Sequence, residues 1–127
     1  MSKQREYQGF RDLVVYQKSY QLAKEIHEVS KTFPKEERYS LTDQIRRASR
    51  SIPVTIAEAW KKRRYPKAFI SKLTDSSAES GEVTVWLDFA LDFGYIDQEK
   101  YDYFQNAFTE VSKMIHGMID HPDKFTW

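Results

Sequence analysis

The chain has 127 residues, which suits a single domain, and its four Gly and four Pro leave most of the length free for regular structure. It has no Cys, which excludes disulfides and thiolate metal sites, and no apolar run approaches the roughly 20 residues that span a bilayer. These features predict a cytoplasmic protein with no membrane segment, and the net charge of +1 alone excludes no partner.

The near-neutral net charge hides two oppositely charged halves. Residues 1–64 have 15 Lys and Arg against 8 Asp and Glu, whereas residues 65–127 have 5 against 11. Two interpretations stay open. The basic half attracts a polyanion, or the acidic half neutralises it, either within one chain or between subunits.

The first predicted helix covers about residues 12–32. Asp12 is a residue of the N-cap type, and apolar residues then recur at helical spacing as far as Phe33. A second apolar stripe, from Leu13 to Ala23, predicts contact with two neighbouring elements. Pro34 ends the helix, because the residue before a proline disfavours the helical backbone.

The second predicted helix covers about residues 40–63. Ser40 and Asp43 have the spacing of a capping box, and one apolar line follows. Pro53 interrupts this line, and because the apolar period continues beyond it we expect a kink rather than a stop. A run of four basic residues, 61–64, closes the helix, where cations favour the negative end of the helix dipole.

Two further helices are predicted over about residues 67–93 and 97–120. Gly94 is a helix-stopping residue after the third, and Asp97 begins the fourth. Four long amphipathic segments with short connections predict an all-α, antiparallel up-down four-helix bundle that forms one domain over residues 1–127. We expect flexible ends at residues 1–9 and 122–127.

No catalytic or metal site is predicted. A di-iron carboxylate bundle needs Glu three residues before a ligating His, but Lys24 precedes His27 and Lys113 precedes His116. Gly-rich phosphate loops, nucleophile elbows and metalloprotease helices are also missing. We therefore expect a protein that is not an enzyme, with no metal and no cofactor, and expect its His residues to be solvated polar side chains on the surface.

Basic residues of the second helix form the candidate nucleic-acid interface. Three of them are expected one turn apart on its outward side, and four more follow at its end, where they would contact phosphates. The alternative is a solvated face or ion pairs with Asp43, Glu58 and the acidic third helix. The candidates are Arg46, Arg47, Arg50, Lys61, Lys62, Arg63 and Arg64.

Four aromatic residues, Trp60, Trp86, Phe89 and Phe93, form the candidate subunit interface. They are too many for the outer side of a monomer, since large exposed apolar patches usually mark contacts. The alternative is that they complete the core.

Several segments together resemble a known family, the bacterial four-helix bundle proteins or 23S rRNA-intervening sequence proteins. The hallmark is Gln44-Ile45-Arg46-Arg47-Ala48, continued by Ser51-Ile52-Pro53 and Ile56-Ala57-Glu58. The segments 10–18, 33–37 and 91–96 also match, so the resemblance covers about residues 10–119. Thr55 and Ala59 depart from it, because the family usually has Asn and Gly there, which puts close backbone contact at the second helix in doubt.

The resemblance implies a left-handed up-down bundle, often assembled as a ring-like homopentamer. The chain is also similar to the accessory variability determinant of diversity-generating retroelements, a basic pentameric bundle that binds nucleic acid. Our hypothesis is a homo-oligomeric, pentameric scaffold that binds RNA or DNA through its second helix. The alternative is a protein–protein adaptor, in which the arginines form intersubunit ion pairs with acidic residues such as Asp75, Glu79, Glu82 and Asp88.

Overall fold

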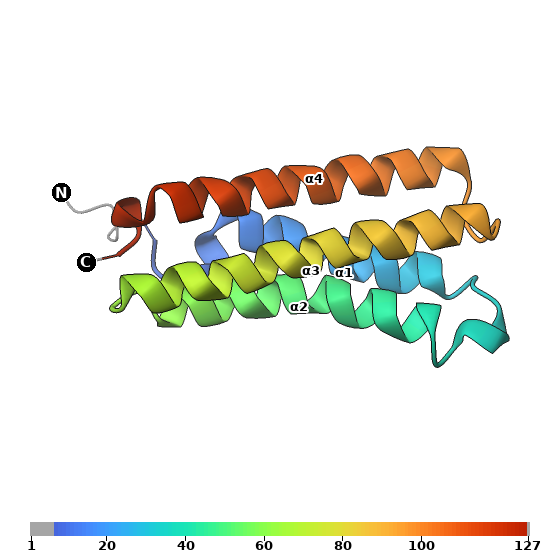
Figure 1. The fold of residues 1–127 in the computed structure, drawn as a ribbon, viewed down its shortest axis with the longest axis horizontal. Helices are drawn as coiled ribbons and strands as arrows, with labels where there is room; N and C mark the ends of the chain where they lie inside the picture. The colour runs from blue at the N-terminus through green and yellow to red at the C-terminus, as the bar shows by residue number, and fades with distance from the viewer. Residues whose placement is uncertain (1–6, 127) are drawn as a thin grey trace.

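The computed structural model describes residues 7–126 and contains four long helices that run alternately up and down (Figure 1). The helices are α1 (Val14–Ser30), α2 (Leu41–Lys61), α3 (Pro66–Asp92) and α4 (Gln98–Asp120). Short 3-10 turns flank them at η2 (Phe10–Asp12), η3 (Lys35–Glu37) and η4 (Pro122–Lys124). No strand occurs in residues 7–126, so the all-α four-helix bundle is confirmed, with each helix boundary within two residues of its expected position.

The inward face of α3 is the centre of the core. Its predicted inner line is buried throughout, from Phe69 to Ala90. Two small residues of this line join neighbouring helices: the Ser76 hydroxyl donates to the carbonyl of Ile52 on α2 at 3.1 Å, and the Ser80 hydroxyl donates to the carbonyl of Phe108 on α4 at 3.1 Å. Small side chains let the helix backbones approach closely enough for these bonds, which satisfy both buried hydroxyls.

Two of the predicted helix ends are confirmed. The Asp97 carboxylate accepts a hydrogen bond from the backbone N–H of Lys100 at 2.8 Å, which satisfies a donor that the first turn of α4 leaves unpaired. Gly94 has φ 77°, the left-handed conformation that ends α3 at low cost.

The other two predicted caps are wrong. Asp12 closes η2 and accepts from the backbone N–H of Gln8 at 2.7 Å, so α1 begins two residues later. Ser40 precedes α2, but its hydroxyl donates to Glu37 at 2.6 Å instead of accepting from α2. Glu37 caps the helix in its place, because its carboxylate also accepts from the backbone N–H of Leu41 at 3.4 Å.

Helix α2 continues without interruption through Pro53, which is buried. The stop that a proline often causes is therefore absent from this helix, as expected, and the kink itself stays a prediction. Thr55, one of the departures from the family pattern, donates to the carbonyl of Ser51 at 2.7 Å. Ala59, the other departure, is fully buried.

The ends of the described chain are packed rather than free. Tyr7 meets the Trp60 ring edge-on, with centroids 5.6 Å apart, and Phe125 contacts both Tyr7 and Phe69 at 6.2 Å. The flexible ends expected over 1–9 and 122–127 stay a prediction, although aromatic contacts are found at Tyr7 and Phe125; residues 1–6 and 127 lie outside the described residues. None of the described helices is long and apolar enough to cross a membrane.

Candidate functional site

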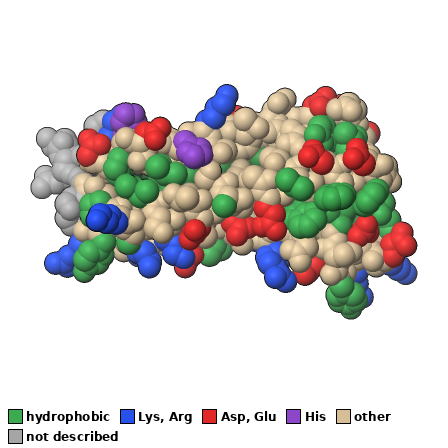
Figure 2. All heavy atoms as spheres, in the orientation of Figure 1, with side chains coloured by type: hydrophobic (Ala, Val, Ile, Leu, Met, Phe, Trp, Pro, Cys, Tyr) green, Lys and Arg blue, Asp and Glu red, His purple; other side chains and the backbone are tan. Residues whose placement is uncertain are grey.

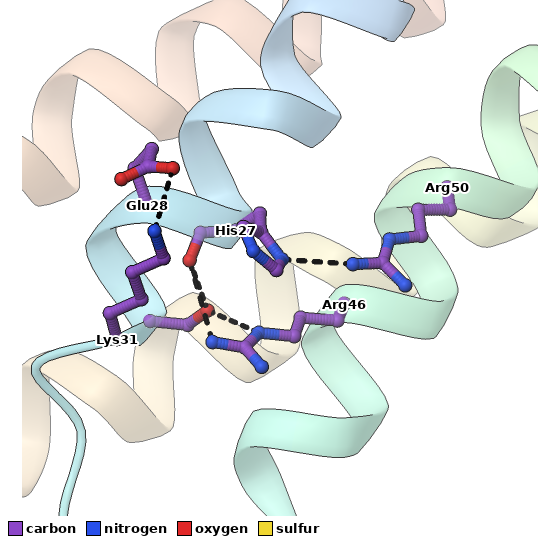
Figure 3. Close-up of polar contacts among 6 residues, drawn as sticks. His27, Glu28, Lys31, Arg46 and Arg50 are labelled. Atoms are coloured by element: carbon purple, nitrogen blue, oxygen red, sulfur yellow. Dashed lines mark hydrogen bonds and ion pairs between the residues drawn. The ribbon is translucent and has the colours of Figure 1, made fainter.

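Two of the candidate arginines hold α2 against the end of α1 (Figure 3). Arg46 donates from Nε to the Ser30 hydroxyl at 2.7 Å and from Nη2 to the His27 carbonyl at 3.4 Å. Arg50 lies 2.9 Å from Nδ1 of His27. The expected outward position of Arg46 is wrong, because this side chain is half-buried and its bonds satisfy acceptors in the last turn of α1, where cations are favoured.

Arg47 and Arg50 are both exposed, as expected. Arg47 forms an ion pair of 3.1 Å with Asp43, one turn earlier on α2. Exposed pairs of this kind add little stability, because water and salt screen them. The predicted pairing with Asp43 is confirmed, whereas Glu58 pairs with Lys72 at 3.7 Å and with none of the candidate arginines.

The basic run at the end of α2 is mainly exposed. Lys61, Lys62 and Arg64 lie on the surface, and no ion pair joins any of them to another described residue. Arg63 differs, because its guanidinium lies 3.6 Å above the centre of the Trp60 ring and its Nε donates to the Trp60 carbonyl at 2.9 Å. Burial against this ring lowers the pKa of Arg63.

A cavity that the sequence did not predict lies on the outward side of the first half of α2. Its volume is about 540 Å³, and its charged lining is Arg38, Arg46, Arg47, Arg50 and Asp43. Thr42 also lines it and is 7% exposed. The signal in the sequence was the spacing of Thr42, Arg46 and Arg50 by four residues each, which places these three along one side of α2, whereas Arg38 reaches the cavity from the turn before the helix.

The candidate interface aromatics separate into one core residue and three surface residues. Trp60 is 4% exposed, so its predicted place in an exposed stripe is wrong: it completes the core between Tyr7 and Arg63. Trp86 is half-buried, whereas Phe89 and Phe93 are 43% and 57% exposed. The three rings contact each other in sequence along α3, and we call them the aromatic ridge.

Acidic side chains border the aromatic ridge. Trp86 Nε1 donates to Glu82 at 3.4 Å, and Asp88 accepts from the Tyr101 hydroxyl at 2.6 Å. The pKa of Glu79 is raised by burial first, and then by a hydrogen bond with Glu82. Figure 2 shows a hydrophobic patch bordered by Asp and Glu over the half of this face where α3 ends.

A second apolar surface follows α1. It is an open groove of about 1220 Å³ between α2 and α4, and we call it the α1 groove. Tyr16 and Tyr20 stack in it with centroids 5.9 Å apart, and Pro53, Val54 and Ala57 line its α2 side. Charges of both signs border the groove, so its apolar floor, rather than its net charge, would select a partner.

The His residues are not grouped for metal binding. His27 contacts Arg50, and His116 Nε2 lies 2.9 Å from the Ser77 hydroxyl. Within residues 7–126 there is no group of three or more His, Asp or Glu that would hold a metal ion. These contacts show that two of the His residues have hydrogen-bond partners as well as surface positions.

Comparisons with known proteins agree with this architecture. Residues 11–117 match the family described as 23S rRNA-intervening sequence protein. No curated protein matches the chain. Among solved structures, the chain is similar to a protein of unknown function from the S23 ribosomal protein family of Bacteroides thetaiotaomicron VPI-5482, with 30% sequence identity and a TM-score of 0.76 over 84% of this chain and 96% of that one. Because the match covers most of its length, the chain belongs to the 23S rRNA-intervening sequence protein family.

Proposed function

We propose that the protein is a non-enzymatic, cytoplasmic scaffold of identical subunits, arranged as a pentamer, that binds RNA or DNA through α2. The observation that carries the assembly is the aromatic ridge, where Phe89 and Phe93 expose about half of their surface on a well-packed bundle. Contiguous exposed aromatic side chains are costly in water and usually mark a contact surface.

The α1 groove is the surface that a ridge from a second subunit would enter. The ridge is convex and the groove concave, both are largely apolar, and they lie on different helices of one chain. A contact between two different surfaces is heterologous, and where its rotation closes it forms a ring rather than an open filament. This geometry supports a ring rather than a two-fold dimer.

The exposed cations at the end of α2 support nucleic-acid binding. Lys61, Lys62 and Arg64 extend from the last turn of α2, and Lys67 is exposed at the start of α3. Clustered cations bind the phosphate backbone by releasing its counterions, a mode with little sequence preference and strong dependence on salt. A ring would bring several copies of this cluster together, which raises affinity through multivalency.

Assembly is tested by sedimentation velocity at micromolar concentration. The Phe89→Gln, Phe93→Gln double variant should sediment as a monomer with wild-type helical content, because both side chains are exposed within the subunit. The matched control is Val14→Gln with Tyr65→Gln, two residues that are each 63% exposed away from both surfaces. A monomeric wild type, or a ridge variant of wild-type size, would overturn the proposal of assembly.

Nucleic-acid binding is tested by fluorescence anisotropy with mixed RNA and DNA at several salt concentrations. Replacing Lys61, Lys62 and Arg64 together by Gln should lower affinity at least about tenfold and reduce the salt slope by about 2–3. The control replaces three other exposed lysines, Lys31, Lys35 and Lys113, and should change affinity less than about threefold. Equal losses in both triple variants would show that no defined interface exists.

A protein–protein adaptor is the second candidate. It is favoured by Arg46 and Arg50, whose bonds to α1 show that basic residues of α2 also serve packing. In this case the oligomer would form as described, yet anisotropy would detect no binding of RNA or DNA at about 50 mM salt, where phosphate contacts are strongest.

A further inference from the structure

The arginine-lined cavity on α2 has the chemistry of an anion site. Four arginines line it against one acidic residue, Asp43, so positive charge predominates. It also lies beside the first turn of α2, where the helix dipole favours negative charge. We call this cavity the arginine pocket.

Thr42 provides an independent observation. Its hydroxyl is buried and has no hydrogen-bond partner among the described residues. Later hydroxyls on the same helix, Ser49, Ser51 and Thr55, each donate to a carbonyl one turn earlier. Thr42 stands in the first turn, where no helical carbonyl precedes it, and burying an unpaired hydroxyl is unfavourable.

The guanidinium groups around Thr42 are already positioned. Arg46 uses two donors and Arg50 one donor on α1, and Arg47 uses one donor on Asp43. A guanidinium has five N–H donors, so each retains donors beyond these bonds. Because the bonds to α1 hold Arg46 and Arg50 in place, a ligand would not bear the full entropic cost of ordering them.

We propose that the arginine pocket binds a phosphoryl group, with the Thr42 hydroxyl donating to one oxygen and Arg46, Arg47 and Arg50 supplying charged donors. The tetrahedral oxygens of a phosphoryl group suit this arrangement better than the planar pair of a carboxylate, since hydroxyl and guanidinium donors converge from different directions. The inference deepens the proposed nucleic-acid function, and rests on it for the source of the phosphoryl group. That source is either an internal phosphodiester of a strand or a phosphate monoester at its end.

The first experiment is an NMR titration of the full chain with inorganic phosphate in buffered sodium chloride. The expected result is saturable shifts of the Thr42, Asp43 and Arg47 backbone amides at millimolar phosphate. Thr42→Val and Arg47→Gln should each weaken binding about tenfold, which corresponds to the loss of one charge-assisted hydrogen bond. Asp43→Asn should tighten it severalfold, because it removes the acidic residue from the lining.

The matched control is Lys61→Gln, which removes one positive charge from the same helix. Lys61 lies eleven residues beyond Arg50, about 16 Å along the helix axis and more than a Debye length away at physiological salt. It should change phosphate affinity less than about twofold. Thr42→Val is nearly isosteric and removes an unpaired hydroxyl, so its melting temperature should equal or exceed that of the wild type, which keeps a loss of binding interpretable.

Equal binding by Thr42→Val and the wild type, equal weakening by Lys61→Gln and Arg47→Gln, or shifts that do not saturate would each overturn the proposal. The second experiment titrates a trinucleotide with and without a 5′-phosphate. Shifts at Thr42 with both forms assign the pocket to the phosphodiester, and shifts with the phosphorylated form alone assign it to the monoester. If inorganic phosphate binds as described while long RNA and DNA do not, the pocket stands and the proposed nucleic-acid function fails.

Discussion

The two basic stretches of α2 look alike in the sequence and differ in the structure. In the first stretch, Arg46 and Arg50 bond to the last turn of α1, and Arg47 pairs with Asp43 within α2. In the second, Lys61, Lys62 and Arg64 extend into solvent, while Arg63 lies flat on Trp60. The first stretch therefore joins helices in addition to lining the arginine pocket, whereas the second only presents charge.

This difference teaches that charge alone does not define an interface. Arg46 and Arg50 flank the buried side of α2, so their position on the helix commits them to α1. At the end of α2, Lys61, Lys62 and Arg64 form no ion pair with another described residue, so their charge stays available. A substitution that tests nucleic-acid binding should therefore be made at these three residues or at Arg47, because a double substitution of Arg46 and Arg50 would also loosen the bundle.

The largest effect is expected from the residue that anchors the second stretch. Trp60→Ala should lower the free energy of unfolding by about 3–5 kcal/mol, because it removes a buried ring that packs against Tyr7 and supports Arg63. Lys62→Ala, two residues away and exposed, should change it by less than about 0.5 kcal/mol. Urea denaturation measures both, and a loss under about 1 kcal/mol for Trp60→Ala would contradict its place in the core.

An intermediate effect is expected where the first stretch contacts α1. Arg46→Ala should lower the free energy of unfolding by about 1.5–3 kcal/mol, because it leaves the Ser30 hydroxyl and the His27 carbonyl without this partner. Arg47→Ala should cost less than about 0.5 kcal/mol, since its ion pair is exposed. Arg46→Lys should restore only part of the loss, because an ammonium group cannot reproduce the planar fork. Similar losses for Arg46→Ala and Arg47→Ala in urea denaturation would contradict a packing role that Arg46 has and Arg47 lacks.

The smallest effect is expected at Glu37, which caps α2 ahead of the first stretch. Hydrogen bonds from Ser40 and then Tyr95 lower the pKa of Glu37 below its ordinary value of 4.5. Its contribution to stability is therefore complete above that value and is lost as the pH falls through the lower folded-state pKa. Because solvent screens this partly exposed group, the wild type should lose less than about 1 kcal/mol more than Glu37→Gln between about pH 6 and about pH 3. Thermal melts across this range would check it, and identical pH profiles would contradict it.

Helix positions were predictable because each depends on a local pattern. The buried line of α3 and the ends at Gly94 and Asp97 follow from apolar spacing, backbone freedom and capping chemistry. The caps at Asp12 and Ser40 were predicted wrongly, since the Asp12 carboxylate is bonded to the Gln8 N–H and the Ser40 hydroxyl to Glu37. A local pattern identifies a residue able to cap a helix but not the neighbour that takes its hydrogen bond.

The candidate site was predictable only in composition. The sequence identified the arginines but not the packing of Arg46 on α1, which depends on how two helices meet. Trp60 was placed outside the apolar line, although its spacing of four from the buried Ile56 continues the core face. Thr42 was missed because a buried hydroxyl becomes informative only when the absence of a partner among the described residues can be observed.

The contact between the aromatic side chains of Tyr7 and Phe125 brings the first and last described segments of the chain together. A circular permutant that opens the chain at the exposed turn over Lys35–Glu37, and joins the original termini through a short glycine-rich linker, would keep the same helix arrangement. The first and last described segments lie at the pole opposite the α3–α4 turn (Figure 1), so a dye or fusion partner attached there would leave Phe93 unobstructed. In a ring of subunits, every such attachment would emerge on the same rim.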